Sequence, residues 1–165
     1  MKKFLSLLVV VAICFIFVGE CSAERICVIP NSFQGEDLCI EASEIRIVRL
    51  KDSQNGKPQY GFLVPTERYN PERDEITEYN FHNFVFFKTF DGKWCAANIS
   101  KESASMEKIK IGSAMVIDPN EKIQNYRLAI FNAGSKYVDV DSIGNTEARY
   151  SSEGNGGTIA FFSEG

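Results

Sequence analysis

The feature that most constrains the fold is a succession of short apolar segments separated by turn residues. Glu44–Leu50 alternates apolar and polar side chains, which is typical of a half-buried strand. An Asn55-Gly56 step then leads into Tyr60–Val64, and Asp91-Gly92 follows the aromatic segment Phe81–Phe90. Because helical periodicity is almost absent, the pattern predicts about ten short strands in an all-β barrel or sandwich.

The same patterns predict the secondary structure of the remaining segments. We expect a single short helix over Lys101–Glu107 with Ser100 as its cap, and a loop over Pro65–Asp74, where two prolines and several charges occur. The other expected strands are Glu75–Tyr79, Trp94–Ile99, Lys108–Ile111, Ala114–Ile117, Tyr126–Phe131, Tyr137–Val140, Ala148–Tyr150 and Ile159–Phe162.

Several of these segments group into three hairpin-like units, which suggests an internal repeat. The units are Ile45–Val64, Val85–Asn98 and Tyr126–Asp141. Aromatic residues at corresponding places in the three units recur with a period of about 40 residues, which is within the range of repeat architectures.

The turns of these units resemble those of the β-trefoil superfamily. Asp91-Gly92-Lys93-Trp94 and Gly134-Ser135-Lys136-Tyr137 are similar to turns of fascin-like trefoils, and Val138-Asp139-Val140 is similar to a step in ricin-B-type lectin repeats. The resemblance implies a β-trefoil-like barrel of three hairpin repeats. A lipocalin-like barrel or a β-sandwich would give the same string of short strands and stays an alternative.

The lectin resemblance also implies one carbohydrate site, in the last repeat. Its sugar-binding aspartate falls on Asp139, its stacking aromatic ring on Tyr150 and its hydrogen-bonding amide on Asn155. Such a set suits a sugar, because a carboxylate and an amide bind adjacent hydroxyls while a ring stacks on the apolar face.

The first 23 residues have the pattern of a secretory signal peptide. Met1-Lys2-Lys3 precedes an apolar run over Phe4–Val18, and small residues end at Ala23. The run is short for a membrane span, so we expect secretion without membrane insertion after cleavage. Residues 24–165 then form a single domain, with residues 24–44 as a disulfide-bonded N-terminal segment.

Three cysteines remain after the signal peptide. In an oxidising compartment Cys27 and Cys39 are the natural pair, closing a short loop, although a Cys39–Cys95 bridge stays open. Cys95 is then expected as a buried thiol, with a covalent dimer through this residue as the alternative.

Charge limits the partners of the domain. The chain has 18 basic and 22 acidic residues and a net charge of −4, without a basic cluster, which argues against nucleic acid. Asn98-Ile99-Ser100 is a sequon that predicts glycosylation of an exposed Asn98.

The sequence gives little support for catalysis or for metal binding. His82 is the single histidine, and it lies between phenylalanines, so we expect neither a nucleophilic couple nor a metal site nor any cofactor. Asp139 and Asp141 are two apart on an expected strand and would share a face, but a solvated strand face explains them. Asn145 and Glu147 add oxygen atoms nearby without the spacing of a calcium loop.

The sequence therefore predicts a secreted, non-catalytic binding module that recognises a carbohydrate or an extracellular protein through loops at one end of the barrel. A protease inhibitor or toxin-like effector is an alternative, with the segment Pro65–Asp74 and its Arg68 and Arg73 as the loop presented to an enzyme. An extracellular structural protein crosslinked through Cys95 is a further alternative.

Overall fold

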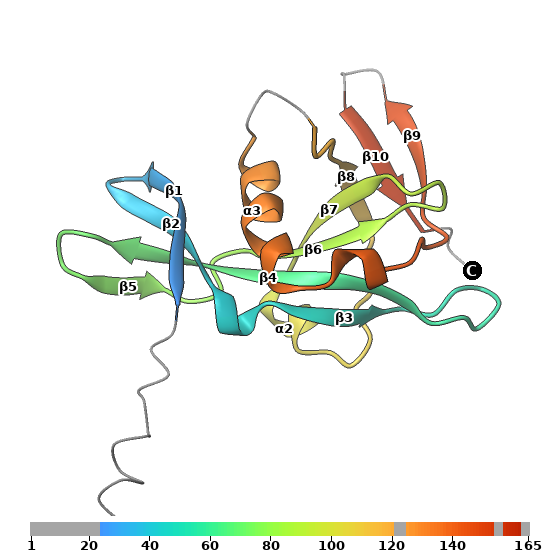
Figure 1. Cartoon of the computed structure of the whole chain (residues 1–165), viewed down its shortest axis with the longest axis horizontal. Helices are drawn as coiled ribbons and strands as arrows, with labels where there is room; N and C mark the ends of the chain where they lie inside the picture. The colour runs from blue at the N-terminus through green and yellow to red at the C-terminus, as the bar shows by residue number, and fades with distance from the viewer. Residues whose placement is uncertain (1–23, 121–124, 154–156, 163–165) are drawn as a thin grey trace, which may run out of the picture.

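The computed structural model describes residues 24–120, 125–153 and 157–162, and within these ranges the chain is mostly β-strand (Figure 1). The strands form one antiparallel sheet, which confirms the all-β class. The elements are β1 (Arg25–Phe33), β2 (Glu36–Glu41), η1 (Ala42–Glu44), β3 (Arg46–Leu50), β4 (Gln59–Asn70), β5 (Glu75–Glu78), β6 (Asn83–Lys88), β7 (Trp94–Ile99), α2 (Lys101–Ala104), β8 (Ser113–Val116), α3 (Tyr126–Gly134), η2 (Ser135–Tyr137), η3 (Val140–Ser142), β9 (Arg149–Glu153) and β10 (Gly157–Phe161).

The 12-residue strand β4 organises the sheet. Its first half pairs with β3 on one side and β6 on the other, and its second half pairs with β2 and β5. The order is β1-β2-β4-β6-β7-β8-β10-β9. The strands β1, β2 and β5 with residues 66–70 of β4 form a wing, which extends to the left of the rest in Figure 1.

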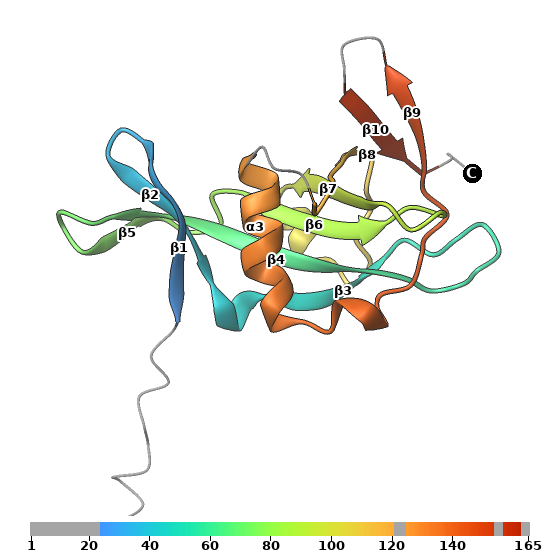
Figure 2. The same cartoon turned by 45° about the horizontal axis from the view of Figure 1, so that its top comes forward.

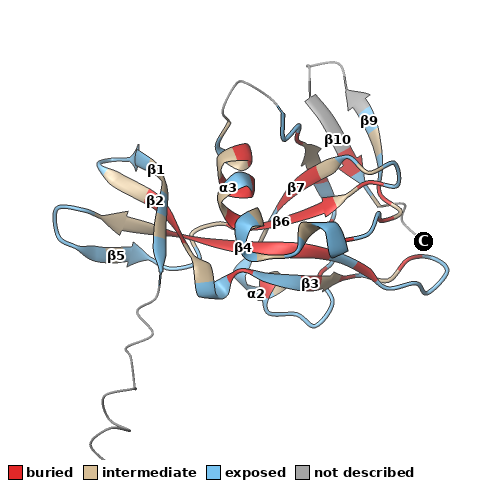
Figure 3. Ribbon diagram, viewed as in Figure 1, coloured by how far each residue is buried: buried red, intermediate tan, exposed pale blue. Residues whose placement is uncertain are grey.

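The central strands are buried on both faces, so they read as continuous apolar runs (Figure 3). Side chains alternate across the sheet: Phe62, Phe84 and Phe86 enter one core, whereas Leu63 and Phe87 enter a second core on the opposite face. The strongly aromatic sequence is therefore needed to fill two apolar layers rather than one.

Helix α3 covers the first core, as Figure 2 shows from a second direction. The ring of Phe131 lies 5.8 Å from that of Phe62, 5.3 Å from that of Phe86 and 5.1 Å from that of Trp94. At Gly134 a Cβ atom would lie 2.6 Å from a methyl carbon of Val64, so the end of the helix packs closely on β4.

This helix replaces a predicted strand. The interpretation of Tyr126–Phe131 as extended is wrong, because Asn125 caps the segment by accepting a hydrogen bond from Leu128 N at 2.9 Å. The expected strand over Tyr137–Val140 is also wrong: two 3-10 turns, η2 and η3, occupy residues 135–142. The third expected hairpin is thus helical.

The other two expected hairpins are confirmed and share one turn. In the first turn, Ser53 N donates to Lys57 O and Gly56 N donates to Ser53 O; in the second, Thr89 N donates to Lys93 O and Gly92 N donates to Thr89 O. The hydroxyl of Ser53 also accepts from Lys57 N at 2.9 Å, and that of Thr89 accepts from Lys93 N at 3.0 Å. Both turns place a glycine at positive φ, 71° at Gly56 and 85° at Gly92.

Within the described residues the sheet stays open, so the closed barrel expected for a trefoil or a lipocalin is not seen. The nearest approach to closure is one parallel bridge between Leu50, at the end of β3, and Ile109. The second core lies beside this bridge and takes side chains from β3, β4, β6, β7 and β8.

The loop expected over Pro65–Asp74 is largely strand. Strand β4 continues to Asn70, and only residues 71–74 form the turn into β5. The charges that suggested a loop are neutralised instead: Glu67 accepts a hydrogen bond from Arg25 at 2.7 Å, and Arg68 pairs with Glu36 at 2.5 Å.

The expected disulfide is confirmed. Cys27 and Cys39 are bonded and stand directly opposite each other in the pairing of β1 with β2. The bridge therefore fixes the register of the N-terminal hairpin of the wing, and it excludes the alternative Cys39–Cys95 pairing in this structure.

Candidate functional site

A hollow, which we call the end pocket, lies at the end of the sheet opposite the wing. Its volume is about 840 Å³, against about 160 Å³ for a second pocket beside Pro65 and Tyr79. A volume of this size is typical of sites for small ligands. The lining residues are Leu50, Lys51, Asp52, Ser53, Gln54, Gln59, Ile109, Lys110, Ile111, Gly112, Glu147 and Phe162.

The floor of the end pocket is apolar and belongs to the second core. Leu50 and Ile109 are both 1% exposed, and Ile111 is also buried. Backbone hydrogen bonds hold the floor together, because Lys51 N donates to Ile109 O and Ile109 N donates to Arg49 O, each at 2.9 Å. The segment before β8 is thereby fixed against the end of β3.

The walls are polar, and hydrogen bonds hold them in place. Buried Gln59 donates to Lys51 O at 3.0 Å and accepts from Glu147 N at 2.7 Å. The carboxylate of Glu147 accepts from Gln54 N at 3.0 Å. The turn after β3 and the segment before β9 are therefore tied to each other across β4, which makes the pocket preformed.

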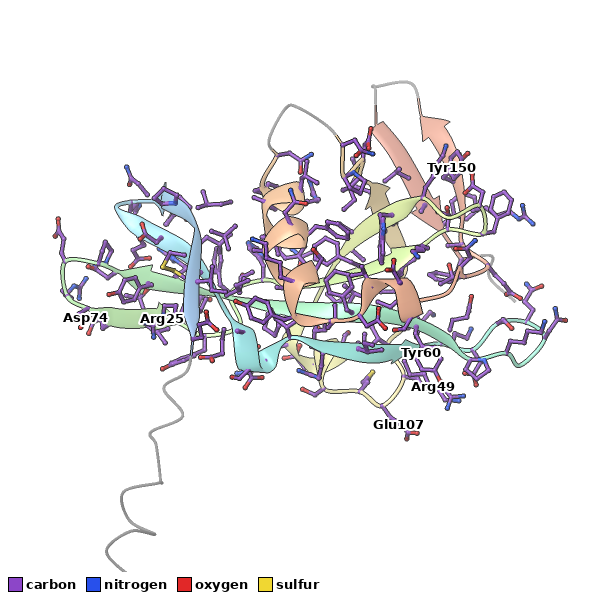
Figure 4. The ribbon with its side chains drawn as sticks, viewed as in Figure 1. Arg25, Arg49, Tyr60, Asp74, Glu107 and Tyr150 are labelled. Atoms are coloured by element: carbon purple, nitrogen blue, oxygen red, sulfur yellow. A yellow bond between two sulfur atoms is a disulfide. The ribbon has the colours of Figure 1, made fainter. Side chains whose placement is uncertain are left out.

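The charges at the rim are arranged around Asp52. Its two carboxylate oxygens accept from Lys108 at 2.7 Å and from Arg49 at 2.8 Å, and these hydrogen bonds lower the pKa of Asp52. In Figure 4, Arg49 of β3 lies on the right-hand side of the molecule, whereas Arg25 of the wing and Asp74 of the adjoining turn lie on the left. The side chains of Lys51 and Lys110 are exposed beside this cluster.

Tyr150, predicted as a stacking aromatic, lies on β9 in a second cluster. Its hydroxyl donates to Asp91 at 3.0 Å and accepts from Lys93 at 2.7 Å, and the Lys93 ammonium lies 4.0 Å from its ring centre. Hydrogen bonds from Thr89 and Tyr150 lower the pKa of Asp91. This cluster joins β9 to the turn between β6 and β7.

Asp139, the predicted sugar-binding carboxylate, is exposed at the start of η3. It accepts from Asp141 N at 3.2 Å, so the two acids belong to a 3-10 turn and the expectation that they share a strand face is wrong. Asn155 lies outside the described residues. Asp139 accepts hydrogen bonds within its own turn, from Asp141 and Ser142, whereas Tyr150 bonds to Asp91 in the turn between β6 and β7.

The predicted modification site is accessible. Asn98 is exposed near the end of β7, and its side chain contacts the His82 ring nitrogen Nδ1 at 3.2 Å. Ser100, the third residue of the sequon, caps α2 by accepting from Ser103 N at 3.1 Å, as the sequence predicted. Glycosylation at Asn98 stays a prediction.

Cys95 is a free and fully buried thiol in the second core. Its sulfur contacts Lys93 O at 3.7 Å, and burial raises the pKa of the thiol to about 12. A thiol in this state packs as a small apolar side chain. The dimer through Cys95 stays a prediction, and it would require β7 to expose this sulfur.

In the ranges that the structure describes, no group of three or more histidine, cysteine or acidic side chains is placed to hold a metal ion. The helices of the same ranges are too short or too polar to cross a bilayer. The predicted signal peptide, residues 1–23, is not among the described residues.

Sequence reasoning missed the end pocket, although it identified most of its parts. The turn with Asn55-Gly56 was predicted, but Lys108–Ile111 was predicted as a separate strand, whereas the structure has only an isolated bridge at Ile109. A signal that could have linked them is the shared alternation of Leu50-Lys51 and Ile109-Lys110, because paired strands place like side chains on the same face.

Comparison with known proteins adds no relative: no family model, curated protein or solved structure matches this chain.

Proposed function

We propose that the protein is a secreted, non-catalytic binding module that holds a carbohydrate in the end pocket. The observation that carries the proposal is the composition of this pocket, in which an apolar floor of Leu50 and Ile109 lies beneath a ring of polar side chains. Sugars need both, because their hydroxyls require hydrogen-bond partners while their ring faces favour apolar contact.

The polar groups have suitable chemistry. The carboxylates of Asp52 and Glu147 offer acceptor positions beyond those used by their protein partners, since a carboxylate has about four lone-pair sites. Lys51 and Lys110 offer donors, and the ring of Phe162 supplies an aromatic surface. The ligand class follows from this combination of apolar and polar groups, and the proposed site is moved from Asp139 and Tyr150 to the end pocket.

Secretion is part of the proposal. It is supported by the signal-peptide pattern ending at Ala23 and by the Cys27–Cys39 bridge, since disulfides persist mainly in oxidising compartments. Catalysis is not proposed, because the single histidine, His82, lies against Phe81 and Asn98 instead of beside a nucleophile.

The test is a glycan array probed with the secreted protein and two glycine variants. Gly112 lines the end pocket, and a Cβ atom there meets no atom within 4 Å, so Gly112→Trp should obstruct the pocket, with its unfolding midpoint measured to show that the fold is kept. Gly144→Trp is the matched control, because Gly144 is equally open but is not among the lining residues.

We expect the array to show saccharides bound by the wild-type protein and by Gly144→Trp, and lost with Gly112→Trp. If the bound saccharides are unaffected by Gly112→Trp, the site lies elsewhere and the proposal fails. An array without any bound saccharide removes the carbohydrate ligand altogether.

Protease inhibition is the second candidate, and the β4–β5 turn is the observation that favours it. Arg73 is exposed in this turn, and Asn70 accepts the backbone N–H groups of Glu72 and Arg73 at 3.0 Å each, which holds the turn in one shape. An inhibitor would block a trypsin-like protease stoichiometrically, and Arg73→Ala would abolish the block. Arg68 does not belong to this loop, since it lies within β4.

A further inference from the structure

Two lysine side chains of the end pocket make no ion pair or hydrogen bond within the described chain. Lys51 and Lys110 are both exposed and both line the pocket. The bridge between Leu50 and Ile109 brings them together, because each lysine directly follows a bridged residue. The backbone of both lysines is thus held at one rim, and both residues line the pocket, although the chain as a whole carries a net charge of −4.

The acidic side chains nearby are already engaged. Asp52 accepts from Arg49 and Lys108 through different oxygens, and its lowered pKa reflects those two cations. Glu147 accepts from the backbone of Gln54 at 3.0 Å, and its position is fixed by its own N–H, which donates to Gln59. Neither carboxylate forms an ion pair with Lys51 or Lys110.

The lining of the pocket has two lysines, Lys51 and Lys110, and two carboxylates, Asp52 and Glu147. Arg49 and Lys108 lie beside the lining and pair with Asp52. The hydrogen bond to Asp52 and the charge of Glu107 both raise the pKa of Arg49, and these seven groups together carry a net charge of +1. Like charges that line one pocket repel each other, and a bound anion relieves that repulsion. The unpaired lysines are the groups that such an anion would meet.

We propose that the end pocket selects acidic saccharides, with Lys51 and Lys110 pairing with a carboxylate or sulfate group of the sugar. This inference rests on the proposed function, and it names the class of ligand for the same site. The apolar floor and Phe162 contact the sugar ring, while the two ammonium groups distinguish an acidic sugar from a neutral one of the same size.

The test compares an acidic trisaccharide with its uncharged methyl ester and with a trisaccharide that carries sulfate instead of carboxylate. Isothermal titration of the wild-type protein uses trigalacturonic acid, its fully methyl-esterified form and a sulfated galactose trisaccharide. The protein variants are Lys51→Met/Lys110→Met, Gly112→Trp, and the control Lys101→Met/Lys136→Met, which removes the same charge from exposed lysines outside the lining.

We expect the wild type and the control to bind an acidic trisaccharide at least tenfold more tightly than the ester. Each lost lysine should weaken acid binding about threefold to fivefold, and the preference should disappear in Lys51→Met/Lys110→Met. The two acidic ligands separate a carboxylate preference from a sulfate preference, and a preference for either supports the inference.

Three other results have distinct meanings. If the acid and the ester bind equally and Gly112→Trp abolishes both, the acidic class is wrong while the carbohydrate site stands. If Gly112→Trp binds every ligand as the wild type does, the site lies elsewhere, and the proposed function fails together with this inference. If the wild type binds none of the three ligands, this inference fails, while the glycan array decides the proposed function.

Discussion

Replacing Phe131 with alanine should remove a large part of the stability of the fold. The side chain is 6% exposed, and its ring packs on Phe62, Phe86 and Trp94 at distances of 5.1–5.8 Å. Truncating a buried phenylalanine costs about 3–5 kcal/mol, and the aromatic pairs place this site toward the upper part of that range. For a domain of ordinary stability, this is a large fraction of the total.

The assay is urea unfolding followed by tryptophan fluorescence. Trp94 is the single tryptophan and directly contacts Phe131, so its emission reports both global unfolding and this contact. The midpoint of Phe131→Ala should fall at unchanged slope. The control Asn132→Ala alters an exposed position of the same helix and should stay within about 0.5 kcal/mol of wild type. A loss below about 1 kcal/mol for Phe131→Ala would show that α3 does not cover the first core.

Three further predictions test other contacts. A Cβ atom at Gly61 would lie 2.5 Å from the carbonyl oxygen of Phe86, so Gly61→Ala should lower the free energy of unfolding by about 1–3 kcal/mol, whereas Gly112→Ala should change it little. The folded-state pKa of Asp52 is lowered from 3.8, so its carboxylate stabilises the fold above the unfolded pKa and this contribution is lost as pH falls through the folded pKa. Asp52→Asn should therefore be less stable than wild type at neutral pH and equal to it in strong acid, and parallel stability curves would contradict this. Cys95, with a pKa of about 12, should resist iodoacetamide at pH 8 until urea unfolds the chain.

Local chemistry made part of the fold predictable. The Asn55-Gly56 and Asp91-Gly92 steps predicted two hairpins, because glycine at positive φ suits a tight turn between strands. Ser100 was identified as a helix cap, and Cys27–Cys39 as the disulfide. In each case the deciding contact lies within a few residues of the chain or follows from the small number of cysteines.

Tertiary contacts decided the parts that were wrong. The apolar pattern of Tyr126–Phe131 is too short to distinguish a strand from a helix. The conformation of this segment depends on the aromatic layer that Phe131 covers. Pro65 and the charges that follow it look like a loop in isolation, but Glu67 and Arg68 find partners on β1 and β2. Such pairings join residues far apart in sequence, so local composition could not predict them.

The end pocket was unpredictable for a related reason. Its walls come from four separated parts of the chain: residues 50–59, residues 109–112, Glu147 and Phe162. The predicted site of Asp139, Tyr150 and Asn155 used neighbouring residues of one supposed repeat, and that repeat is helical and turn-like over residues 126–142. Without the third hairpin, the spacing that supported those residues loses its structural basis.

The most direct test of the account is amide chemical-shift mapping during a titration with trigalacturonic acid. We predict that the largest shifts fall at Lys51–Gln54 and at residues 109–112, with little change at Asp139 and Tyr150. Shifts centred on Asp139 and Tyr150, or on the wing, with an unperturbed end pocket would contradict the claim that this pocket is the ligand site.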